Sequence, residues 1–196
     1  MNWRKIEDNW KCFVKDFNLK DESSENNYFY GKQELYKASE NFLNFIIYYE
    51  NKFNKSIELG SSFRVGHRLM MVSPIELYGR YRIAIEKKPL WKRLFNSTDK
   101  LRVEITDSSI IGCLPLEEIE MVITYFPDLK LSIKEFDKYQ NRQIPYGQTV
   151  LLIESSYQPI ELEHLKKTRE IITLILEKLK ENKKIKPYTA RSIKNS

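Results

Sequence analysis

The segment of this sequence best suited to chemistry is residues 60–68, Gly-Ser-Ser-Phe-Arg-Val-Gly-His-Arg. Glycines let backbone N–H groups approach an anion, and an arginine guanidinium matches the geometry of a phosphate or carboxylate. The segment lacks the lysine and hydroxyl ending of a phosphate-binding P-loop. The alternation of Phe63 and Val65 with polar residues also fits a structural hairpin, and we favour this interpretation. An anion-binding loop is the second interpretation, and a catalytic site is the third. The side chains that would bind an anion or an acidic substrate are Ser61, Ser62, Arg64, His67 and Arg68.

A second candidate is residues 87–95, Lys-Lys-Pro-Leu-Trp-Lys-Arg-Leu-Phe. Proline can begin a helical turn, which would place the apolar residues on one side and the basic residues on the other. We favour a cap on the protein's own core. The alternatives are an anionic surface, where each basic residue contributes about 1 kcal/mol, and a protein partner. The residues that would contact an anionic surface are Lys87, Lys88, Trp91, Lys92, Arg93 and Phe95.

A third candidate is a basic and aromatic face on a predicted sheet. Alternation over residues 77–86 puts every second residue on one side of a strand, and residues 101–106 predict a neighbouring strand. Proteins that bind single-stranded nucleic acid combine basic and aromatic side chains in this way. The chain has no RNA-recognition, helix-turn-helix or zinc-finger signature, so a solvated sheet face is the favoured interpretation. The residues of this face are Tyr78, Arg80, Arg82 and Arg102.

Recognisable catalytic and metal-binding motifs are absent from the sequence. There is no HExxH, GxSxG or CxxC pattern, and the two cysteines, Cys12 and Cys113, are far apart. We expect both cysteines to pack as small apolar side chains and His164 to be a solvated residue on a helix. A metal site needs several converging ligands, which no local spacing provides. The sequence therefore predicts no metal and no cofactor, and favours a non-catalytic protein over an enzyme.

The net charge of +6 is unevenly distributed along the chain. Residues 60–102 hold ten Lys or Arg against three acidic residues, and residues 180–196 hold six against one. Clustered charge raises the local potential and the rate of association with an opposite charge. We therefore predict an interaction or regulatory domain that contacts an anionic membrane surface or an acidic protein. Nucleic-acid association is the first alternative, and an enzyme acting at residues 60–68 is the second.

Hydrophobic periodicity predicts the elements that would position these residues. Residues 2–18 predict an amphipathic helix with Trp3, Ile6, Trp10, Phe13 and Phe17 on one face, either packed on the core or forming a short dimer seam. Residues 33–53 predict a second helix. The remaining predicted helices are 115–126 and 160–181, and the predicted strands are 57–65, 68–72, 77–86, 101–106, 129–133 and 150–153.

These elements predict an α+β fold. We expect a mostly antiparallel sheet, with the two C-terminal-half helices on one face and two amphipathic helices at the N-terminus. The predicted segments are a helical part at 1–55, an α+β domain at 56–181 and a basic, mobile tail at 182–196. The sequence has no run of about 18 apolar residues and no apolar core of a signal peptide at its N-terminus. We therefore expect a cytoplasmic protein, which could also contact a membrane peripherally. The sequence does not indicate an oligomeric state.

Overall fold

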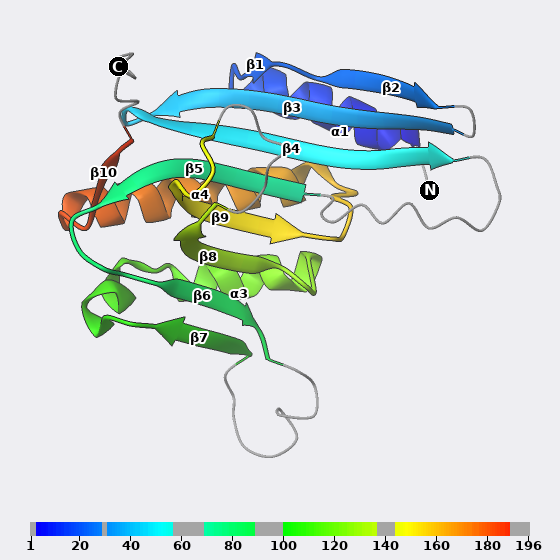
Figure 1. Cartoon of the computed structure of the whole chain (residues 1–196). Coiled ribbons are helices and arrows are strands. Elements are labelled where there is room, and N and C mark those ends of the chain that lie inside the picture. Colours follow the sequence, from blue (N-terminus) through cyan, green and yellow to red (C-terminus); the bar gives the residue numbers. More distant parts are fainter. Residues whose placement is uncertain (1–2, 29–30, 57–68, 89–99, 137–143, 189–196) are drawn as a thin grey trace, which may run out of the picture.

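The computed structural model describes residues 3–28, 31–56, 69–88, 100–136 and 144–188. It confirms a mixed α+β fold with a large antiparallel sheet (Figure 1). The strands pair in the order β1-β3-β4-β5-β9-β8-β6-β7, with β2 also pairing with β3 and β10 with β5. The strands are β1 Lys20–Asp21, β2 Ser24–Tyr28, β3 Gly31–Phe42, β4 Phe45–Ser56, β5 Leu69–Leu77, β6 Ile83–Lys87, β7 Leu101–Ile105, β8 Lys130–Glu135, β9 Thr149–Ser155 and β10 Ile185–Pro187.

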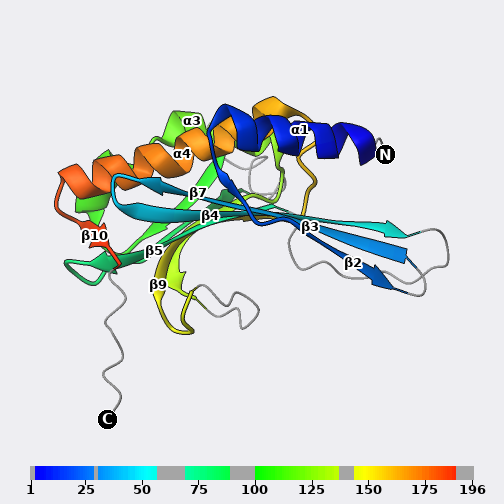
Figure 2. The same ribbon diagram turned by 90° about the horizontal axis from the view of Figure 1, so that it is seen from above.

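The helices lie together on one face of the sheet, as Figure 2 shows for α1, α3 and α4. The main core lies between these helices and the sheet. A smaller apolar cluster lies on the opposite face, where Phe136 and Ile144 pack against alternate residues of β5 and β9. The helices are α1 Trp3–Asp16, the 3-10 helix η1 Ser108–Cys113, α3 Leu116–Tyr125 and α4 Leu162–Glu181.

The predicted N-terminal helix is confirmed, and its aromatic stripe packs on the core. Ile6, Trp10 and Phe13 are buried, and the Trp10 ring stacks on Tyr36 of β3 with centroids 5.7 Å apart. The helix ends at Asp16, and Asn18 in the following turn has a φ of 50°, which directs the chain towards β1. Because this stripe is covered within one chain, the dimer-seam interpretation is wrong.

The predicted helix over residues 33–53 is wrong, because this segment is the β3–β4 hairpin. Leu43 and Asn44 form its two-residue turn, and both have positive φ values, 51° and 71°. A turn of this kind matches the twist of paired strands. Apolar spacings of three and four residues mimicked a helix, but strand alternation buries Phe45, Ile47 and Tyr49. The aromatic and β-branched residues here favour strands intrinsically.

The predicted strand over residues 77–86 is interrupted. β5 ends at Leu77, and β6 begins at Ile83. At the bend, a Cβ on Gly79 would lie 2.5 Å from the Tyr81 hydroxyl oxygen, so the missing side chain leaves room for the tyrosine. A glycine within a strand pattern often marks such a deviation. Residues 78–82 are therefore a connection between strands and not one strand face.

The other predicted elements agree with the structure where it describes them. The strands near residues 68–72, 101–106, 129–133 and 150–153 and the helices near 115–126 and 160–181 are present. The strand predicted at 57–65 lies outside the described residues. The division into segments stays a prediction, but the first segment is not two helices. Part of the predicted tail is ordered, because residues 185–187 form β10.

A nearly buried ion pair joins the hairpin to α4. Arg169 donates two hydrogen bonds to the carboxylate of Glu40, from Nε at 2.9 Å and from a terminal nitrogen at 2.8 Å. The Tyr49 hydroxyl also donates to Glu40. Burial, followed by the charge of Glu40, raises the pKa of Tyr49, which keeps its proton in place. The guanidinium lies 4.0 Å from the centroid of the ring of Phe17, which directly follows α1, so the pair links this turn to β3, β4 and α4.

His164 is not the solvated residue that the sequence predicted. Its ring stacks on Tyr125 at a centroid distance of 4.4 Å and meets the edge of Phe126, which joins α4 to α3. Burial lowers the pKa of His164, although the carboxylates of Glu161 and Glu163 oppose the shift. Protonation of His164 therefore destabilises the packing of its ring against Tyr125 and Phe126.

Glu40→Ala should lower the free energy of unfolding by about 3–5 kcal/mol, because it leaves Arg169 as an unpaired charge. Chemical denaturation followed by circular dichroism would measure this loss. The control is Glu170→Ala on the exposed side of α4, which removes a 2.8 Å ion pair with Lys167. That change should cost no more than about 1 kcal/mol. Equal losses in the two variants would contradict the structural importance of the Glu40 pair.

His164→Phe should reduce the loss of stability on acidification. The pKa of folded His164 lies below the ordinary value of 6.5, so the unfolded chain takes up a proton at higher pH. Stability is therefore full above the ordinary pKa and falls as the pH drops towards the lowered one. Urea unfolding at about pH 7.5 and about pH 5.5 would compare wild type with the variant. Identical pH dependence in both would show that His164 is not protected from protonation.

Candidate anion-binding surface

Two basic stretches that are far apart in the sequence meet where β10 pairs with β5. Ile185 lies opposite Leu77, and the Tyr78 N–H donates to the Lys184 carbonyl at 3.0 Å. This pairing joins the β5–β6 connection to the end of α4, on the left in Figure 1. We call the resulting surface the basic corner. It comprises the cations Arg80, Arg82, Lys183, Lys184 and Lys186 and the rings of Tyr78 and Tyr81.

The end of α4 directs the chain into this position. The Lys184 N–H donates to the Leu179 carbonyl at 2.8 Å, and the Lys183 N–H donates to the Lys180 carbonyl at 3.0 Å. Lys183 has a φ of 52°, a left-handed conformation that most often belongs to glycine after a helix. The turn therefore carries a lysine where glycine would be less strained. It leads directly into β10.

The lysines of the corner lie close to its aromatic rings. Lys186 Nζ is 6.0 Å from the centroid of Tyr78, and Lys184 Nζ is 5.3 Å from that of Tyr81. Lys184 also donates to the Ser109 hydroxyl at 2.6 Å. Tyr78 is 62% exposed, so the corner presents an aromatic ring next to Lys186.

Acidic residues neutralise only part of the corner. Glu76 forms a 2.8 Å ion pair with Lys186. The hydroxyl and N–H of Ser109 lower the pKa of Asp107, and the charge of Lys184 lowers it further. This carboxylate accepts the Ser109 N–H at the start of η1. Arg80 and Arg82 are exposed, and their side chains are available to an external anion.

Arg102 does not belong to the basic corner. It lies on β7, where its guanidinium pairs with Glu86 at 3.3 Å and with Glu104. The predicted basic sheet face of Tyr78, Arg80, Arg82 and Arg102 therefore does not form as one strand face. The first three residues lie in the β5–β6 connection, and the fourth is neutralised by carboxylates.

The other predicted sites fall largely outside the described residues. The anion loop of Ser61, Ser62, Arg64, His67 and Arg68 does so entirely, as do Trp91, Lys92, Arg93 and Phe95. Their roles stay predictions. Lys87 ends β6, and the Lys88 N–H donates to the Lys100 carbonyl at 2.9 Å. Both lysines are partly exposed at the start of the connection to β7.

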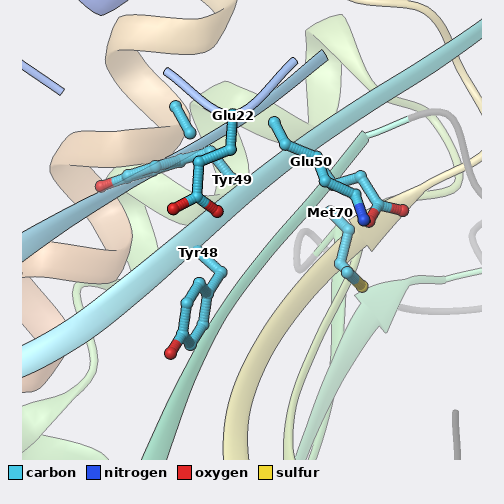
Figure 3. A pocket seen from close by; sticks show the side chains of 7 residues that line it. Glu22, Tyr48, Tyr49, Glu50 and Met70 are labelled. Carbon is cyan, nitrogen blue, oxygen red and sulfur yellow. The ribbon is translucent and has the colours of Figure 1, made fainter. Parts of the chain in front are cut away.

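A shallow pocket lies on β3, β4 and β5, on the face away from the helices (Figure 3). The space inside it is about large enough for one water molecule, far less than a small-molecule ligand needs. Its lining includes Glu50, which forms ion pairs with Lys52 at 2.9 Å and Lys37 at 3.8 Å. Burial raises the pKa of Tyr48, another lining residue, so this phenol stays protonated at neutral pH. The pocket is therefore a weaker candidate than the basic corner.

Nucleophilic and metal-binding groups are not gathered in the part of the chain that the structure describes. No group of three or more His, Cys, Asp or Glu side chains there could hold a metal ion. Cys113 is buried as predicted, and burial raises the pKa of its thiol. Cys12 is exposed, so its predicted packing as a core residue is wrong.

The sequence alone could not identify the complete corner. Tyr78, Arg80 and Arg82 were recognised, but Tyr81 and the lysines of residues 183–186 were not placed beside them. The excess of basic residues after residue 180 was the available signal. Their location depends on β10, a three-residue strand too short to show periodicity.

Comparisons with known proteins do not identify a function for the basic corner. Across the described ranges, none of the helices has the length and apolar character needed to cross a membrane. No protein-family profile matches the chain, and no curated protein or solved structure is significantly similar to it.

Proposed function

We propose that this protein is a non-catalytic, cytoplasmic interaction domain that binds an anionic partner through the basic corner. The observation that carries the proposal is the pairing of β10 with β5. With the Tyr78 to Lys184 hydrogen bond, it places the β5–β6 connection, which holds Arg80 and Arg82, next to the lysines of residues 183–186. Clustering of this kind raises the local potential well above that of evenly spread charges.

The chemistry of the corner supports binding rather than catalysis. Lysine and arginine donate hydrogen bonds and attract anions, but they remain protonated at neutral pH and make poor bases. The carboxylates beside them, Glu76 and Asp107, are held by Lys186 and by Ser109. A surface of cations with occupied carboxylates suits a phosphate-rich or carboxylate-rich partner.

The expected affinity of one corner is low. Lys186 is paired with Glu76, and basic residues beside an anionic leaflet contribute about 1 kcal/mol each, so the other four would contribute about 4 kcal/mol, equivalent to a dissociation constant of about 1 mM. An anionic membrane surface or a strongly acidic protein offers many charges at once, which compensates for weak individual contacts. These are the partners that we favour.

Nucleic acid is the second candidate, and the exposure of Tyr78 favours it. A tyrosine ring that is 62% exposed can stack on a base while nearby cations contact phosphates. Arginines 80 and 82 lie two and four residues further along the same connection. Stacking would distinguish this partner from a lipid surface, because a lipid headgroup offers no aromatic face.

Arg80→Glu/Arg82→Glu should weaken anion binding by about tenfold or more, because both changes reverse charge at the corner. Sedimentation with phosphatidylserine-containing vesicles and anisotropy of a labelled single-stranded oligonucleotide would measure the two kinds of partner. Neutral phosphatidylcholine vesicles would test for charge-independent binding. Wild-type binding should weaken steeply between low and high salt.

The matched control is Arg4→Glu/Lys15→Glu, which makes the same change of charge on exposed residues of α1. It should retain most of the binding. Tyr78→Ala separates the two candidates, since it should weaken oligonucleotide binding much more than vesicle binding. The proposal is wrong if wild type ignores both probes at low salt, or if the two double variants lose binding equally.

A further inference from the structure

β7 lies at one edge of the sheet that the described residues form. It stands last in the strand order and, among the strands that the structure describes, pairs with β6 alone. An edge strand presents a row of N–H and C=O groups that can pair with another chain. The five residues of β7 are Leu-Arg-Val-Glu-Ile, a sequence whose apolar positions are symmetric about the central valine, Val103.

Two hydrogen bonds establish which residues of β7 direct their backbone towards β6. The Lys88 N–H donates to the Lys100 carbonyl at 2.9 Å, and the Thr106 N–H donates to the Arg82 carbonyl at 3.2 Å. In an antiparallel ladder, residues directed at the partner alternate with residues directed away from it. The even-numbered residues from 100 to 106 therefore direct their backbone groups at β6.

The odd-numbered residues Leu101, Val103 and Ile105 consequently direct their N–H and C=O groups outwards. A second β7 strand placed antiparallel and centred on Val103 would meet the same set of groups. Val103 would then pair with Val103 of the second copy, and Leu101 with Ile105. The resulting ladder would satisfy all three outward N–H groups and all three outward C=O groups of each strand.

The charges of β7 are complementary in the same register. Arg102 would lie opposite Glu104 of the second copy, and Glu104 opposite its Arg102. Because these are non-hydrogen-bonded pairs, their side chains approach each other most closely. Both residues are exposed, and both project from the face away from the helices. Two favourable charge pairs would form, related by the twofold axis.

The apolar side of β7 is incompletely covered in the single chain. Val103 pairs with Ile85, which is buried in the main core, so both project towards the helix-covered face. The Val103 side chain is nevertheless 37% exposed. Pairing two β7 strands would bring two Val103 side chains together and shield them from water.

We propose that two copies of this chain associate through antiparallel pairing of their β7 strands about Val103. The result is a twofold-symmetric dimer with one continuous sheet and with the helices of both copies on the same face. Isologous pairing of this kind requires one surface to be complementary to itself, which the Arg-Val-Glu order provides. The inference does not depend on the partner of the basic corner.

Charge exchange provides a direct test by sedimentation velocity over a range of concentrations. Arg102→Glu places like negative charges opposite each other, and Glu104→Arg places like positive charges opposite each other. Each variant alone should raise the dimer dissociation constant by about tenfold or more. An equimolar mixture of the two should restore association, because the all-acidic strand then faces the all-basic strand.

The double variant Arg102→Glu/Glu104→Arg is the second test, since it exchanges the two charges within one strand. It should form a homodimer even though it loses the ion pair of Arg102 with Glu86. Circular dichroism and thermal melting would establish that each variant is folded. A wild type that stays monomeric up to about millimolar concentration would overturn the proposal. So would single variants that dimerise as tightly as wild type, or a mixture that behaves like its separate components.

Discussion

The pairing of β5 is the interaction on which the rest of the structure depends. β5 pairs with β4, β9 and β10, so it joins the N-terminal hairpin, the C-terminal half of the sheet and the end of the chain. Both of its faces are buried, one in the main core and one against Phe136 and Ile144. Pro74 has no N–H to donate, and it lies between Val72, the last residue paired with β4, and Ile75, the first paired with β10. β5 can therefore pair first with β4 and then, after Pro74, with β10.

The candidate site is a consequence of this topology more than of any local motif. Basic residues that lie close together near the end of a chain, such as Lys184 and Lys186, ordinarily belong to a solvated tail. Docking of β10 fixes Lys184 beside Tyr81 and Lys186 beside Tyr78 and reduces the conformational freedom that an anion would otherwise have to restrict. A binding surface on a strand that is itself short can be rigid, provided that its neighbour is a buried central strand.

The sequence predicted elements well where one face alone was buried. α1, α3, α4 and the alternating strands β7 and β8 have such patterns, and they were placed correctly to within a few residues. It failed for the β3–β4 hairpin because Leu43 and Asn44 replace the usual glycine-containing turn signal, which left a helical spacing as the strongest pattern. Of the site, the local basic residues were predictable. Their meeting was not, because it depends on a non-local pair of strands.

The charge pattern at β7 connects the edge of the sheet to the low affinity expected of one basic corner. Edge strands commonly avoid self-association by carrying lysines, since like charges repel an antiparallel copy. Arg102 and Glu104 on either side of Val103 lack this protection, because an antiparallel copy always places opposite charges together. A dimer formed there would carry two basic corners on one rigid sheet. Binding of the second corner would then be intramolecular, so two weak contacts could hold one extended anionic surface.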